Sequence, residues 1–183
     1  SMVDASVGSK TGVDLDNLKN LIGLFSNPEM VLIDSNYLET LPEREFKSGI
    51  AEIIKYGLTF DPKLWEAIQQ DKWKNSDELN AVINQSINIK NKVVLEDYKE
   101  IGLRKVLNYG HTVGHAIESY FLEHSDLEPL LHGEAIGIGM IVEAYISNKQ
   151  YNFPENELEN LKQYILKIYG KTTIDATHYP AIL

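Results

Sequence analysis

The chain has 183 residues, of which 43% are apolar, and this is enough for one domain, or a domain and a fraction, with a real core. With 27 acidic and 17 basic residues the net charge is -10, so nucleic acid and anionic membranes are poor candidates for partners. The absence of cysteine excludes disulfides and thiolate metal sites and suits a reducing cytoplasm, and we expect neither a membrane span nor a signal peptide.

The N-terminal segment, residues 3–12, is a glycine-containing loop around a lysine. Gly8 and Gly12 flank Lys10, so the loop can present backbone N–H groups and an ammonium to an anion. It is not a Walker A loop, because Ser9 precedes the lysine where that motif has glycine. On composition alone, a flexible and solvated terminus is the competing interpretation.

Two elements are predicted next. Residues 15–25 are amphipathic, with apolar side chains at helical spacing, which predicts a helix. Residues 30–33 form a short apolar run that predicts a strand. Because one strand cannot make a sheet, we expect it to pair with something outside this chain.

A strong helix is predicted to begin at Pro42 and to run to about Phe60, where an Asp-Pro pair breaks the pattern. Glu52 and Lys55 are three residues apart and lie on a different side from the apolar residues. Spacing alone therefore predicts that these two charges belong to a solvated face.

Ser76 has the character of a helix N-cap, and the helix that it opens is predicted to reach Asp97. Plotted at roughly 100° per residue, Lys90 and Asp97 fall near the centre of its apolar arc. Charges at such positions are rarely buried unpaired. Either the arc ends at a cleft or the two charges neutralise an opposing group.

Three of the five histidines lie beside glycines in residues 108–118 and 131–134. His111 and His115 are four residues apart and share a face if a helix begins near His111, where the helix dipole disfavours imidazolium. Neutral imidazoles bind metal, and His111 and His132 are candidate ligands. The alternative is a glycine-rich packing surface with ordinary histidines, but the third histidine and the clustered glycines favour metal.

The rest of the chain is also predicted to be helical. An apolar helix follows His132 to about Asn148 despite Gly133, Gly137 and Gly139, and close helix contact or ligand access would offset their cost. A last amphipathic helix is predicted after Pro154. The fold class is therefore mainly α.

Five motifs in unbroken order resemble the 3-dehydroquinate synthase family: residues 3–12, 48–57, 100–104, 107–118 and 131–134. The resemblance implies that residues 3–40 are the hinge loop, helix and strand of the interdomain region. It implies that residues 41–183 are a metal- and substrate-binding helical domain, incomplete at its C-terminus. The NAD-binding α/β domain that precedes it in the family is then absent from this chain.

The resemblance also assigns roles residue by residue. It implies a zinc or cobalt ion held by Glu52, His111 and His132. It implies that the substrate phosphate is bound by Lys10, Asn20 and Asn108, and the carboxylate by Lys90 and Arg104. The polar groups that remain, around the sugar hydroxyls and the proton-transfer path, are Asp4, Lys55, Glu100 and His115. Among these, His115 is our choice for the general acid and base. Ser9 departs from the glycine that the family usually has, which puts the close approach of the loop to phosphate in question.

The implied reaction converts 3-deoxy-D-arabino-heptulosonate 7-phosphate into 3-dehydroquinate and phosphate in the shikimate pathway, a step toward the aromatic amino acids. It proceeds by transient oxidation, phosphate elimination, reduction, ring opening and aldol closure, with NAD carrying the hydride. We expect a cytoplasmic homodimer with a small sugar phosphate as substrate, and no nucleic acid or membrane partner. The alternatives are another sugar phosphate cyclase, or an inactive metal-binding helical fragment.

Overall fold

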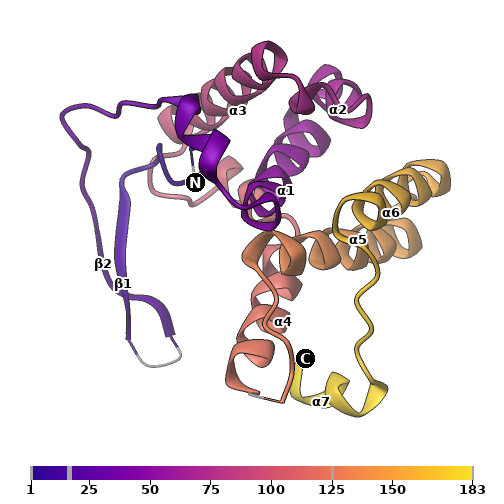
Figure 1. The fold of residues 1–183 in the computed structure, drawn as a ribbon. Coiled ribbons are helices and arrows are strands. Elements are labelled where there is room, and N and C mark those ends of the chain that lie inside the picture. Colours follow the sequence, from indigo (N-terminus) through magenta and orange to yellow (C-terminus); the bar gives the residue numbers. More distant parts are fainter. Residues whose placement is uncertain (1, 16–17, 125, 183) are drawn as a thin grey trace. The chain divides into compact units, whose positions relative to one another are not determined.

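The computed structural model describes residues 2–15, 18–124 and 126–182, without the side chains of residues 14–21. The chain divides into two compact units, residues 1–41 with 56–106, and residues 42–55 with 107–183. The strands are β1 (Lys10–Leu15) and β2 (Leu18–Phe25). The helices are α1 (Glu43–Phe60), α2 (Pro62–Gln69), α3 (Ser76–Glu96), α4 (His111–Glu123), α5 (His132–Tyr151), α6 (Glu155–Tyr169) and α7 (Tyr179–Ile182), joined in part by 3-10 turns (Figure 1).

The prediction of a helix at residues 15–25 was wrong, because this segment forms an antiparallel hairpin of β1 with β2 (Figure 1). Gly12 faces Gly23 in the register, and a Cβ on Gly23 would lie 2.7 Å from the Thr11 carbonyl oxygen. Glycine therefore permits this close pairing of the strands. The helical spacing of the apolar residues was overridden by the cross-strand partner.

The prediction of a strand at residues 30–33 was wrong, because these residues belong to no strand within the part of the chain that the structure describes. Met30 and Leu32 are 77% and 83% exposed. The prediction that a partner lies outside the chain therefore stays a prediction.

The first unit gains its core from the helices that follow α1. Asp61 accepts hydrogen bonds from the Lys63 and Leu64 amides and so caps α2, with Pro62 as the first helical residue. The helix α3 confirms the prediction, except that Asn75 rather than Ser76 is its N-cap. The buried apolar side chains of these elements are Leu64, Trp65, Ile68, Trp73, Val82, Ile83, Val93 and Val94.

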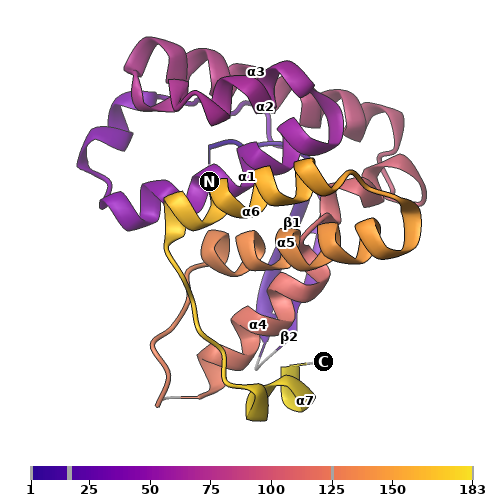
Figure 2. The same cartoon turned by 90° about the vertical axis from the view of Figure 1, so that its right-hand side faces the viewer.

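The second unit is built on α4, α5 and α6, with α5 and α6 running side by side in both views (Figures 1 and 2). Two glycines of α5 explain how close its neighbours come. A Cβ on Gly133 would overlap the Ser48 carbonyl, and one on Gly139 would overlap the Gly110 carbonyl. The predicted close helix contact at the α5 glycines is confirmed for these two.

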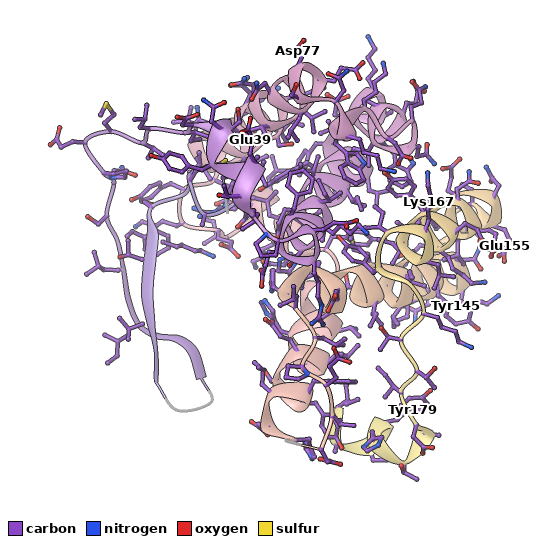
Figure 3. All side chains as sticks on the ribbon, viewed as in Figure 1. Glu39, Asp77, Tyr145, Glu155, Lys167 and Tyr179 are labelled. Carbon is purple, nitrogen blue, oxygen red and sulfur yellow. The ribbon has the colours of Figure 1, made fainter. Side chains whose placement is uncertain are left out.

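Three exposed side chains lie on α5 and α6. Tyr145 of α5 and Glu155 and Lys167 of α6 project away from the helix pair (Figure 3).

None of the helices formed by the described residues has the length and apolar character needed to cross a membrane.

Candidate functional site

Four polar side chains of the second unit form what we call the histidine cluster: Glu52 from α1, His111 and His115 from α4, and His132 from α5. One ring nitrogen from each histidine lies within 4.8 Å of one nitrogen from each of the others. Glu52 Oε1 lies 3.3 Å from His111 Nε2 and 3.2 Å from His132 Nε2. The three residues that the resemblance implied as metal ligands are therefore adjacent.

The hydrogen bonds at the far side of each ring fix which nitrogen faces Glu52. His111 Nδ1 lies 3.1 Å from the Tyr109 carbonyl oxygen, which can only accept, so this nitrogen carries the proton. His132 Nδ1 lies 3.2 Å from Glu118 Oε2, and an ionised carboxylate likewise only accepts. In the neutral rings both Nε2 lone pairs therefore point toward the same carboxylate oxygen.

Three electron-pair donors converging at such distances require a cation among them. Zinc bonds of about 2.0–2.2 Å in tetrahedral geometry separate neighbouring ligand atoms by roughly 3.3–3.6 Å. The 3.2 and 3.3 Å separations measured from Glu52 Oε1 are close to that range. Two imidazoles and one carboxylate are also a common set for a catalytic zinc site. The residues present therefore fit a divalent metal.

Glu52 and Lys55 are buried, with 4% and 1% of their surfaces exposed, so the prediction of a solvated face from spacing was wrong. The two side chains form an ion pair along α1. Burial opposes the charged form of Glu52, but the Lys55 ammonium and the contacts with His111 and His132 outweigh it and hold the pKa of Glu52 well below its usual value. Glu52 is thus kept ionised, as a ligand must be.

The pKa of His132 is shifted in the opposite direction, upward. Partial burial lowers the pKa of its ring, but hydrogen bonds and charges from Glu118 and Glu52 raise it to about 9. Without a metal, the proton on His132 supplies the positive charge that these two carboxylates require. A bound metal must displace that proton.

The backbone around His111 depends on a glycine and on the half-buried carboxylate of Glu143. Gly110 is the N-cap of α4 and has a φ of 79°, a conformation that glycine adopts without strain. Its amide donates to Glu143 Oε2 at 2.9 Å. Helix α4 therefore begins at His111, as predicted.

The start of α5 is held by a network of charged hydrogen bonds. Arg44 donates from Nε to Glu134 Oε1 and from Nη2 to Glu134 Oε2, both at 2.8 Å. Glu134 Oε2 also accepts from the Leu131 amide at 2.8 Å, and Ser48 Oγ accepts from the Gly133 amide at 2.9 Å. A bidentate arginine pair adds geometric precision, and here it fixes the turn that carries His132.

His115 completes the histidine cluster. Its ring lies 5.2 Å from that of His111 and 5.6 Å from that of His132, centroid to centroid, and the residue is exposed. His115 thus lies where it could serve as a third imidazole ligand of a metal bound by the cluster, or as an acid and base beside that metal.

A second polar group lies within the first unit, and we call it the ion-pair cluster. Lys10 forms an ion pair with Glu100, whose Oε2 also lies 3.6 Å from Arg104 Nε. Lys90 Nζ lies 3.0 Å from Asp4 Oδ1. Lys90 is 7% exposed, which confirms that its place on the apolar arc of α3 is explained by an opposing charge. The structure thus brings together five residues that the resemblance assigned to the substrate.

Strained backbone holds this cluster. Ser9 and Glu100 have φ values of 58° and 60°, in the left-handed region that favours glycine. Ser9 therefore adopts the glycine-like conformation after all, and its hydroxyl donates to the Gly8 carbonyl at 2.7 Å. Arg104 joins both segments, because Nη2 donates to the Gly8 carbonyl at 2.9 Å and Nη1 to the Tyr98 carbonyl at 2.7 Å.

The roles assigned to the two asparagines at the phosphate are not tested by the structure. Asn108 is exposed at the end of a 3-10 turn in residues 103–108. Asn20 lies in β2, and its side chain is outside the described part of the structure. Their roles remain predictions.

Sequence reasoning missed two buried residues that support the assigned ones. Glu118 faces His132, and it follows His111 by seven residues on α4, so helical periodicity could have indicated it. Tyr56 donates its hydroxyl to Asp4 Oδ1 at 2.6 Å. Tyr56 follows Lys55 directly, but its partner is 52 residues away, and no local pattern indicates such a contact.

Comparison with known proteins places this geometry in a family. The model for the 3-dehydroquinate synthase C-terminal region matches residues 49–183, and that for its N-terminal region matches residues 1–48. The 3-dehydroquinate synthase of Rippkaea orientalis is 44% identical over 97% of this chain and 49% of its own length. That of Parabacteroides distasonis is 40% identical over 98% and 51%. The chain thus spans about half the length of these relatives.

Solved structures show the same fold. The 2-deoxy-scyllo-inosose synthase complexed with carbaglucose-6-phosphate, NAD+ and Co2+ matches with a TM-score of 0.81 and 31% identity, over 99% of this chain and 50% of its own. The 2-epi-5-epi-valiolone synthase of Streptomyces hygroscopicus, with NAD+ and Zn2+ bound, has a TM-score of 0.84 at 24% identity, over 99% of this chain and 50% of its own. The mainly helical fold is therefore confirmed.

Proposed function

The chain belongs to the 3-dehydroquinate synthase family, and from this membership we propose that it supplies the metal- and substrate-binding part of a metal- and NAD-dependent lyase. The proposed reaction converts 3-deoxy-D-arabino-heptulosonate 7-phosphate into 3-dehydroquinate and phosphate. The observation that carries the proposal is the convergence of Glu52 Oε1 with the Nε2 atoms of His111 and His132. The family also supports a cytoplasmic homodimer for the complete protein.

The proposed metal ligands are Glu52, His111 and His132, with His115 beside them as a residue that acts on the substrate. A zinc or cobalt ion there supplies Lewis-acid polarisation of a substrate oxygen, and NAD, when bound, carries the hydride. Lys55 keeps Glu52 ionised through their ion pair. The Tyr109 carbonyl holds the His111 ring, so that its Nε2 is available.

The ion-pair cluster is proposed to bind the charged ends and hydroxyls of the substrate. Lys90 and Arg104 bind the carboxylate, and Lys10 binds the phosphate together with Asn20 and Asn108. Asp4 and Glu100 accept hydrogen bonds from hydroxyls. These acids pair with the three cations in the structure, so substrate binding exchanges internal ion pairs for ion pairs with the substrate.

His115 is proposed as the general acid and base. It is exposed one helical turn after His111, beside the rings of two proposed ligands, so it can exchange a proton with a substrate hydroxyl held beside the cluster. Lys55 and Glu100 are the other residues proposed for the proton-transfer path. Lys55 is 1% exposed, so its part is to hold charge rather than to contact solvent.

Another sugar phosphate cyclase is the alternative activity. Arg104, which is 3% exposed, and Lys90 favour an acid substrate, because a guanidinium can bind a carboxylate through two parallel hydrogen bonds. A cyclase whose substrate lacks the carboxylate has no need of both cations. Comparing the heptulosonate phosphate with a sugar phosphate that lacks the carboxylate separates the two activities.

Phosphate release in the presence of NAD tests the proposal. We expect the 183-residue chain by itself to give background rates, since no glycine-rich dinucleotide motif occurs in its sequence. Fixed geometry contributes on the order of 7–11 kcal/mol in favourable reactions, and that contribution is lost when the nicotinamide is not positioned. Joining the chain to the NAD-binding domain of a relative should restore phosphate release with the heptulosonate phosphate. A joined protein that binds metal and NAD but releases no phosphate would contradict the proposed reaction.

A further inference from the structure

Glu118 is a buried carboxylate to which neither the sequence nor the proposed function gives a role. It lies on α4 with 7% of its surface exposed, and its Oε2 is 3.2 Å from His132 Nδ1. Burying a carboxylate is costly unless it is paired, so this contact is part of what allows Glu118 to be buried. We propose that Glu118 is a positioning residue that orients the metal ligand His132, an inference that rests on the proposed metal site.

The geometry of the His132 ring supports this role. Its two nitrogens face two carboxylates, Nδ1 toward Glu118 and Nε2 toward Glu52, each at 3.2 Å. Donation from Nδ1 to Glu118 selects the tautomer whose Nε2 lone pair is available to a metal. A carboxylate behind a metal-bound imidazole also raises the basicity of the ring and fixes its orientation.

His111 provides an internal comparison. Its Nδ1 donates to the Tyr109 carbonyl, so both proposed imidazole ligands are held from behind at Nδ1 and directed forward at Nε2. The His111 side chain is 13% exposed and the His132 side chain 39% exposed. Packing therefore restricts the His132 ring less, and its orientation depends more on the hydrogen bond to Glu118.

The position of Glu118 in sequence fits the same role. His111, His115 and Glu118 stand at positions i, i+4 and i+7 of α4 and share one face of that helix. His132 is the first residue of α5, where a side chain has no preceding helical turn to pack against. Glu118 thus connects the first residue of α5 to the face of α4 that carries the other histidines.

The test uses the 183-residue chain with Glu118→Gln, Glu118→Ala and the matched control Glu123→Gln. Glu123 is exposed on the same helix, and its substitution changes the net charge equally. Affinities for Zn2+ and Co2+ are measured by competition with a chelator. We expect Glu118→Gln to weaken binding about 10-fold and Glu118→Ala up to about 100-fold, with the control close to wild type. The Co2+ absorption bands of the Glu118 variants should also change, because the His132 ring is reoriented.

The outcomes separate this inference from the proposed site. Wild-type chain that binds neither ion would overturn the proposed metal site and the inference with it. If the wild type binds metal and Glu118→Gln keeps its affinity and Co2+ spectrum, only the role of Glu118 is refuted. Glutamine has nearly the shape of glutamate, so this arm remains decisive even if Glu118→Ala does not fold.

Discussion

The charges of the two polar clusters of this chain are balanced in different ways. In the ion-pair cluster, Asp4 and Glu100 are neutralised by Lys90 and by Lys10 with Arg104. In the histidine cluster, three electron-pair donors converge on one point, and His132 must take a proton to balance them. The first cluster is complete in itself and must exchange partners to bind a ligand. The second is completed by a cation.

The supporting backbone differs as well. The proposed ligands of the histidine cluster come from three helices, α1, α4 and α5, and hydrogen bonds fix the starts of α4 and α5. Lys10 and Glu100 of the ion-pair cluster stand at or beside residues with left-handed φ values, namely Ser9 and Glu100 itself. The preorganised histidine cluster and the strained ion-pair cluster should therefore respond differently to substitution.

The largest expected effect is loss of the metal. Alanine in place of Glu52, His111 or His132 leaves two of three ligands, so the purified variant should retain no stoichiometric zinc or cobalt after dialysis. His115→Ala should retain it. Elemental analysis measures the metal content, and retention by Glu52→Ala with loss in His115→Ala would show that the three histidines are the ligands instead.

The next effect concerns Arg104 in the ion-pair cluster. Arg104→Lys removes hydrogen bonds to the Gly8 and Tyr98 carbonyls from a side chain that is 3% exposed. Hydrogen bonds from charged donors contribute about 1.5–3 kcal/mol each, and lysine keeps at most one, so the free energy of unfolding should fall by about 2–3 kcal/mol. Urea denaturation measures this, with the exposed Lys105→Ala as a control. An unchanged midpoint for Arg104→Lys would mean that the guanidinium does not hold these segments.

A smaller effect on the stability of the metal-free protein is expected when the pH changes. Glu118 and Glu52 raise the pKa of His132 to about 9 from its ordinary 6.5. This stabilisation of the metal-free protein is therefore complete below pH 6.5 and is lost as the pH rises through about 9. Because the side chain is 39% exposed, solvent screening reduces the effect to about 1–2 kcal/mol.

Thermal unfolding with a chelator measures this pH dependence, and His132→Asn should flatten the profile. Added zinc should reverse the direction of the pH dependence in the wild type. Zinc competes with the proton for His132, so the stabilisation that zinc gives grows as the pH rises. The same pH profile in His132→Asn as in the wild type would exclude His132 as its source.

The smallest expected effect tests whether the backbone at Ser9 is strained. Ser9→Gly relieves a left-handed serine and should raise the free energy of unfolding by about 0.5–1 kcal/mol. Ser26→Gly, at a residue outside the left-handed region, should lower it by a similar amount. Equal shifts in both variants would show that Ser9 is not strained in solution.

The helical spacing of apolar residues predicted the long helices well, because a helix such as α3 or α6 is stabilised by the burial of one of its faces. It failed at residues 15–25, where the spacing suits a helix but the partner strand at residues 10–15 decides the structure. It also failed for Glu52 and Lys55, since a side that opposes the apolar stripe of α1 is itself buried. The proposed metal-ligand set came from the family resemblance. Tyr56 was missed because its partner is distant in sequence, whereas the place of Glu118 on the histidine face of α4 could have been found from helical periodicity.

The contact of Gly133 with Ser48 sets a limit on how this protein can evolve. Any side chain at position 133 would overlap the Ser48 carbonyl, so substitution must separate α5 from the helix that carries Glu52. His132 precedes this glycine, so a substitution would displace a proposed ligand as well as lose packing, and in enzymes a displacement of 1 Å can cost about 100-fold in rate. We therefore expect only glycine to be tolerated at position 133. Substitutions near the histidine cluster should be tolerated only at residues that do not contact Gly133 or Ser48.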